Sequence, residues 1–135
     1  MKYKFVIEQR LPSLNDYINK CKHNKRIAAG FKKKIDEMIG WEIKRQLRGL
    51  QIEKPVIIHV TYVEENKRRD VDNVYSGIKY IQDALVKTQV LQNDNAKHVV
   101  NVIPTIEYAK QSKVIVELEE IMWRSTQYAI NYANR

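Results

Sequence analysis

The chain has 135 residues, a length that suits one compact domain, and 44% of them are hydrophobic, which is enough to bury a core. Its 24 Lys and Arg against 16 Asp and Glu give a net charge of +8. No stretch approaches the roughly 18 consecutive apolar residues of a membrane span, and the apolar run near the start is too short for a signal peptide. The single cysteine, Cys21, forms no internal disulfide, as expected in a reducing compartment. We therefore expect a soluble, basic, cytoplasmic protein.

Alternating β-branched residues predict strands, and apolar residues at helical spacing predict helices. In chain order, the first half is expected to contain a strand at 3–8, a short helix at 14–19 capped by Ser13, a basic loop at 20–30, and a helix at 31–47 that ends near Gly49. The second half is expected to contain a strand at 56–65, a turn at 67–73, and a helix to about residue 86. A loop at 91–97 and strands at 98–106 and 113–119 follow. No repeat, linker or low-complexity segment divides the chain.

The order of these elements predicts an α+β fold. We expect one small domain with a mixed or antiparallel sheet and two main helices packed on it. Residues 1–120 would form this domain. Residues 121–135 would form a C-terminal extension, either a helix or a frayed end.

Positive charge is concentrated in the first third of the chain. Residues 1–50 carry 13 Lys and Arg but only 5 Asp and Glu, whereas residues 51–135 carry 11 of each. The density is highest from Lys20 to Lys34. A field of one sign raises the local concentration of polyanions such as nucleic acids. The alternative is a solvated face that only promotes solubility.

The segment RRDVDNVYSGIKYIQDAL, residues 68–85, separates apolar and polar side chains when it is projected on a helix. The apolar positions share one stripe: Val74, Ile78, Ile81 and Leu85. The polar positions share the opposite stripe: Asp72, Ser76, Lys79 and Asp83. We therefore expect the polar stripe to face away from the core, with a lysine between two carboxylates.

Three aspartates in and after this segment form a candidate metal site. Asp70 and Asp72 are separated by one residue, so an extended or turning backbone points both carboxylates to one side. Such close carboxylates repel unless a cation lies between them, and Mg²⁺ prefers oxygen ligands. Asp94 supplies a third carboxylate from the loop at 92–95, and Lys79 would contact a phosphoryl oxygen. The structural alternatives are a helix cap for the aspartate pair, a surface ion pair between Lys79 and Asp83, and a simple turn around Asp94.

These motifs resemble the RusA-type Holliday-junction resolvases, which are small homodimeric endonucleases of bacteria and phages. The resemblance covers about residues 3–120. It rests on LPSLNDYI at 11–18, RRDVDN at 68–73, Lys79 four residues before Asp83, and Asp94 eleven residues after Asp83. The family has its active-site lysine four residues after the second aspartate, where this chain has Ser76. Lys79 lies on the same stripe, about 4.5 Å further along the helix.

The resemblance implies an Mg²⁺-dependent endodeoxyribonuclease, with Mn²⁺ as a substitute ion, that cuts four-way DNA junctions by paired, symmetric hydrolysis in recombination and repair. It assigns the metal to Asp70, Asp72 and Asp94, and catalysis to these three and Lys79. Asp83 and Asn73 would contact the site residues and hold them in position. The residues expected to bind DNA are basic: Lys25, Arg26, Lys32, Lys33, Lys34, Arg68 and Arg69. No glycine-rich phosphate loop is present, so we expect no nucleotide cofactor. Two alternatives stay open: a flap or fork nuclease, and a non-catalytic basic nucleic-acid-binding module.

Overall fold

The computed structural model describes residues 1–122, with the side chains of residues 14, 15, 17 and 23 left out. It contains β1 (Lys2–Ile7), α1 (Leu14–His23), α2 (Lys25–Leu47), β2 (Val56–Glu64), α3 (Val71–Tyr75), α4 (Ile78–Lys87), β3 (Val99–Tyr108) and β4 (Lys113–Glu120). Each predicted strand is present within two residues of its expected limits. Beyond Met122, the predicted C-terminal extension lies outside the described residues.

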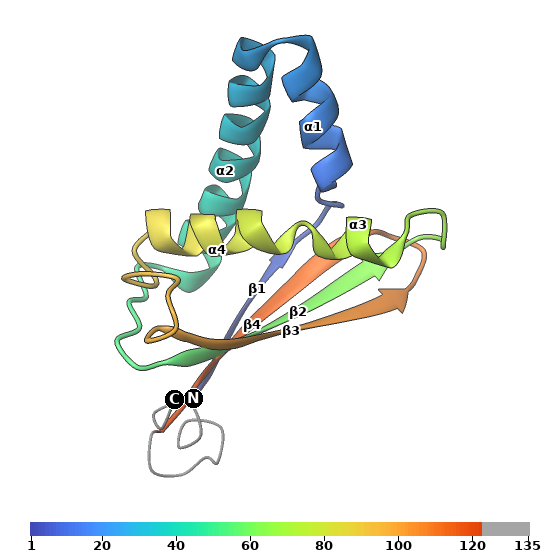
Figure 1. Cartoon of the computed structure of the whole chain (residues 1–135). Helices are drawn as coiled ribbons and strands as arrows, with labels where there is room; N and C mark the ends of the chain where they lie inside the picture. Colours follow the sequence, from blue (N-terminus) through green and yellow to red (C-terminus); the bar gives the residue numbers. More distant parts are fainter. Residues whose placement is uncertain (123–135) are drawn as a thin grey trace.

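The four strands form one mixed sheet in the order β1-β4-β2-β3. β4 pairs antiparallel with both β1 and β2, whereas β2 and β3 are parallel. The parallel pair requires a crossover connection, and α3 and α4 form it. All four helices lie on one side of the sheet, and α1 and α2 project away from it as a helical hairpin (Figure 1). The α+β prediction with a mixed sheet is therefore confirmed.

The core lies between the sheet and helices α2 and α4. Alternate strand residues such as Phe5, Ile58 and Val116 face the helices and are completely buried. Ile39 in α2 and Ile81 in α4 meet them from the other side. In the predicted apolar stripe of the segment 68–85, Val74 on α3 and Ile81 and Leu85 on α4 are buried and Ile78 is partly buried, so the stripe is confirmed as the core-facing side of the two helices.

The basic segment 20–30, predicted to be a loop, is helical except at Asn24. There the backbone is extended (φ −170°, ψ 129°), and Asn24 Oδ1 accepts a hydrogen bond from the backbone N–H of Arg26 at 2.7 Å. Asn24 thus ends α1 and caps α2. Lys and Arg are good helix formers, so the charge run was the wrong signal for a loop. The predicted Ser13 cap is confirmed: Ser13 and Asp16 form a reciprocal capping box.

The helix expected to run from residue 73 to 86 is divided at Ser76 and Gly77 into α3 and α4. A Cβ on Gly77 would lie 3.2 Å and 3.3 Å from atoms of the buried Leu11 side chain. This close approach packs the junction of the two helices against the segment that follows β1. The division lies between Asp72 and Lys79, where the sequence has three more residues than the spacing of the RusA-type motif. Within the described residues, none of the helices combines the length and apolarity needed to cross a bilayer.

Candidate active site

The aspartate pair lies at the start of α3, directly after the turn that leaves β2. Asp70 is the N-cap residue of α3, but its side chain forms no capping hydrogen bond. Asp72 lies in the first turn, and its Oδ1 accepts a hydrogen bond from the backbone N–H of Asn73 at 3.0 Å. Both aspartates are exposed. Asp70 therefore occupies the cap position of the structural alternative, but its carboxylate makes no capping hydrogen bond and stays accessible to a ligand.

A buried ion pair fixes the turn that presents Asp70. The Nε of Arg69 lies 3.3 Å from Oε1 of Glu64, the last residue of β2, and only 14% and 6% of the two side chains are exposed. Arg69 Nη1 also donates a hydrogen bond to the Leu11 carbonyl at 2.8 Å. Burial lowers the pKa of the Arg69 guanidinium, while the Glu64 carboxylate opposes this shift. Arg69, predicted to contact DNA, therefore points inward and connects β2 to the segment before α1.

Lys79 lies between two carboxylates from different parts of the chain. Its Nζ is 3.1 Å from Asp83 Oδ1 on α4 and 3.7 Å from Asp94 Oδ2 in the loop before β3. The hydrogen bond to Asp83, together with the charges of Asp83 and Asp94, raises the pKa of the Lys79 ammonium above its ordinary value. The structure thus brings together Lys79, Asp83 and Asp94, and holds the lysine in its charged form.

The described residues contain no group of three or more His, Cys, Asp or Glu side chains arranged to hold a metal ion. The convergence of Asp70, Asp72 and Asp94 on one ion therefore stays a prediction. The donor chemistry fits Mg²⁺, because exposed carboxylates are hard oxygen ligands. Such an ion often uses only one or two carboxylates and completes its shell with water and substrate phosphate.

The exposed residues predicted to bind DNA lie at the start of α2, further along α2, and in the turn before α3. Lys25 and Arg26 are exposed in the first turn of α2, near the end of the projecting helical hairpin (Figure 1), and Arg68 is exposed in the turn before α3. The other predicted residues lie on α2 nearer the sheet: Lys32, Lys33 and Lys34.

Lys32 and Lys33 differ in their surroundings although they are adjacent. Lys32 Nζ lies 3.5 Å from Asp83 Oδ2 and 3.8 Å from Asp36 Oδ2. Lys33 is 77% exposed, and its Nζ lies 4.0 Å from Glu37. The structure therefore makes Lys32 part of the candidate site, whereas Lys33 projects into solvent.

Sequence reasoning missed the roles of Glu64 and Asp36. An acidic residue at the end of the apolar strand VIIHVTYVE, followed by a basic turn, was an available signal for Glu64. For Asp36, the four-residue spacing from Lys32 on α2 was an available signal, whereas its other partner, Lys87, lies on α4.

Comparison with protein-family models finds no match. Among curated proteins, the chain is 32% identical over 76 residues to the crossover junction endodeoxyribonuclease RusA of Aquifex aeolicus (strain VF5). The alignment covers 56% of this chain and 58% of that relative, so the chain spans less than two thirds of the relative's length. The resemblance inferred from the motifs is therefore supported, and the chain is similar to RusA-type resolvases over just over half of its length.

Proposed function

We propose that this chain is an Mg²⁺-dependent endodeoxyribonuclease that cuts four-way DNA junctions. The observation that carries the proposal is the placement of Lys79 between Asp83 and Asp94, on the same side of α4 that the sequence motif marks as functional. A surface ion pair between Lys79 and Asp83 alone would not involve Asp94, yet Lys79 Nζ also lies 3.7 Å from this carboxylate in the loop before β3. The Lys79 side chain is 69% exposed. Its charge is therefore available to a ligand from solvent.

In this proposal, Asp70, Asp72 and Asp94 hold the metal and Lys79 contacts the scissile phosphate. A bound Mg²⁺ supplies Lewis-acid chemistry and a more acidic water. The Lys79 ammonium stabilises the negative charge that develops on the phosphate in the transition state. Glu64 and Arg69 keep the turn before Asp70 in place, so the aspartate pair stays at the start of α3.

DNA attraction would come from the helical hairpin of α1 and α2. No acidic residue occurs between Asp16 and Asp36, whereas this stretch is rich in lysine and arginine. Backbone phosphate contacts of this kind give affinity without sequence preference and weaken with salt. A homodimer would place two sites in two-fold symmetry, which matches the approximate symmetry of a four-way junction and the paired cuts.

The decisive experiment measures junction cleavage with and without Mg²⁺ for the wild-type chain and for Asp72→Asn. We expect paired, symmetric incisions that require Mg²⁺. The variant should lose at least 100-fold in cleavage rate, on the order expected for a lost catalytic group, yet should bind the junction at least as tightly because a negative charge facing phosphate is gone. Glu53→Gln, which removes an equally exposed carboxylate elsewhere, is the matched control.

Other substrates and outcomes separate the alternatives. Preference for a flap or a replication fork over the four-way junction would make the chain another branched-DNA nuclease. Binding that is insensitive to EDTA, with no incision of any branched DNA, would make it a binding module. Retained Mg²⁺-dependent cutting by Asp72→Asn would overturn the metal-ligand assignment.

A further inference from the structure

Six side chains of alternating charge form an ion-pair network that extends from the loop before β3, across α4, to α2. In order along the network they are Asp94, Lys79, Asp83, Lys32, Asp36 and Lys87. The three positive and three negative charges balance. The sequence predicts Lys79, Asp83 and Asp94 for the catalytic site and Lys32 for DNA binding. The structure adds Asp36 and Lys87, and it joins Lys32 to Asp83.

Asp83 is the central carboxylate of the network, and its two oxygens face two different lysines. Oδ1 lies 3.1 Å from Lys79 Nζ, and Oδ2 lies 3.5 Å from Lys32 Nζ. Only 18% of the Asp83 side chain is exposed. A carboxylate held from both sides loses rotational freedom, so Lys32 limits the directions in which Asp83 can hold Lys79.

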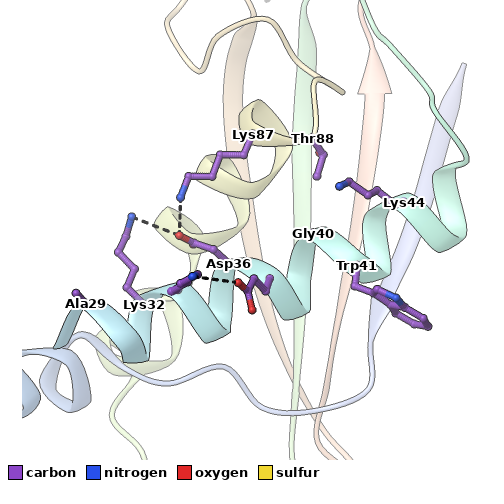
Figure 2. A pocket seen from close by; sticks show the side chains of 10 residues that line it. Ala29, Lys32, Asp36, Gly40, Trp41, Lys44, Lys87 and Thr88 are labelled. Carbon is purple, nitrogen blue, oxygen red and sulfur yellow. Dashed lines mark hydrogen bonds and ion pairs between the residues drawn. The ribbon is translucent and has the colours of Figure 1, made fainter. Parts of the chain in front are cut away.

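Lys32 also forms an ion pair with Asp36 on its own helix. Asp36 Oδ2 lies 3.8 Å from Lys32 Nζ and 2.6 Å from Lys87 Nζ at the end of α4. Figure 2 shows the Asp36 carboxylate between Lys32, from the same helix α2, and Lys87, from α4. Because only 11% of the Asp36 side chain is exposed, this anchor is shielded from solvent more than the lysines are. The network therefore connects α2 to α4 at two carboxylates.

The same geometry makes Lys32 poorly suited to bind a DNA phosphate. Its side chain is 36% exposed, against 69% for Lys79 and 77% for Lys33, so its ammonium is the least accessible of the three to a phosphate from solvent. Lys33, the next residue on α2, is 77% exposed, and its Nζ lies 4.0 Å from a Glu37 carboxylate that is itself 66% exposed. Of these two adjacent lysines, Lys33 is the one that can contribute to DNA attraction.

We propose that Lys32 is a positioning residue, which fixes Asp83 and thereby holds Lys79 beside Asp94. This inference rests on the proposed nuclease function, in which Lys79 is the residue that contacts the phosphate. Lys32 touches neither the substrate nor the reacting atoms. Its contribution is to keep the exposed and flexible Lys79 side chain in one direction while the phosphate binds.

The test compares Lys32→Gln with Lys33→Gln, because both substitutions remove one positive charge from the same turn of α2. Single-turnover cleavage rates and junction dissociation constants are measured with Mg²⁺ present. We expect Lys32→Gln to reduce the cleavage rate about fivefold with an unchanged dissociation constant, on the order that one partly exposed ion pair supplies. Lys33→Gln should raise the junction dissociation constant, and its rate at saturating enzyme should fall less than that of Lys32→Gln. Lys32→Arg should restore most of the rate, since it keeps the charge.

A second measurement follows the Lys79 side chain without any DNA. NMR signals of the Lys79 Cε and Nζ atoms should shift in Lys32→Gln and in Asp83→Asn but not in Lys33→Gln. Equal rates for Lys32→Gln and Lys33→Gln, or an unmoved Lys79 signal, would overturn the positioning role while the nuclease function stands. A wild-type chain that cuts no branched DNA would instead overturn the proposed function, and the catalytic part of this inference with it.

Discussion

Glu64 is a charged residue at the end of an otherwise apolar strand, and its burial is tolerated because Arg69 lies against it. Removing a charge from water is costly unless a partner of opposite charge and further hydrogen bonds compensate for the lost hydration. Arg69 Nε provides the charge at 3.3 Å, and Arg69 Nη1 uses the Leu11 carbonyl. A residue expected from its position to bind DNA therefore serves to hold the turn before Asp70.

Replacing Arg69 with Met should lower the free energy of unfolding by about 3 kcal/mol, because Glu64 is then left buried without a partner. Arg68→Met is the matched control, and its exposed side chain should cost less than about 0.5 kcal/mol. Urea unfolding measures both. Adding Glu64→Gln to Arg69→Met should recover part of the loss, since no charge remains buried. Equal effects of the two arginine substitutions would show that Glu64 does not depend on Arg69.

At the level of the elements, β1 is an edge strand whose free backbone is covered by a side chain of α2. Gln46 Oε1 accepts a hydrogen bond from the Val6 N–H at 2.8 Å, and Gln46 Nε2 donates one to the Val6 carbonyl at 2.7 Å. The amide thus reproduces the two hydrogen bonds that another strand would make. Nε2 also donates to Glu42 on the preceding turn of α2 at 2.8 Å. This arrangement fixes α2 to the sheet and protects part of the edge from pairing with other chains.

Gln46→Leu should reduce the free energy of unfolding by about 2 kcal/mol, because it leaves a partly buried backbone N–H and carbonyl without partners. The exposed Gln51 provides the control, and Gln51→Leu should change stability by less than about 0.5 kcal/mol. Thermal or urea unfolding of both variants checks the difference. An unchanged stability of Gln46→Leu would mean that water replaces the amide at no cost.

Across the whole molecule, positive charge is balanced near the candidate site and unbalanced at the far end of the helical hairpin. Lys32, Lys79 and Lys87 all face carboxylates in the ion-pair network. By contrast, Lys20 and Lys22 are exposed in a stretch of sequence without acidic residues. Because α1 and α2 project from the sheet (Figure 1), we expect this end to be the part that meets DNA if the proposed function holds.

A triple variant in which Lys20, Lys22 and Lys25 are each replaced by Gln should bind the junction more weakly. The slope of log affinity against log salt should fall by up to about 2.7, roughly 0.9 per lost phosphate contact. The control is the triple replacement of Lys2, Lys4 and Lys113, which alternate with the buried Phe5, Val114 and Val116 and so lie on the opposite face of the sheet. That control should leave the slope nearly unchanged. Equal slopes for the two triple variants would mean that the hairpin does not meet DNA.

Much of the local structure followed from the sequence, because side-chain direction within one element depends only on its period. Two residues four positions apart on a helix share a face, so the spacing of Lys79 and Asp83 was sufficient to place them together. Alternation and β-branched residues identified the strands. The same reasoning failed at residues 20–30, where charge was given more weight than helix propensity.

The sequence by itself determined the four strands, the pairing of Lys79 with Asp83 on α4, the aspartate pair and the uneven charge. Only the tertiary structure decided that β2 and β3 are parallel, that Arg69 points inward to Glu64, and that Lys32 lies against Asp83. The physical reason is that contacts between elements depend on how the core packs one element on another. Side-chain spacing within a helix or strand carries no information about which residue of a distant element lies opposite.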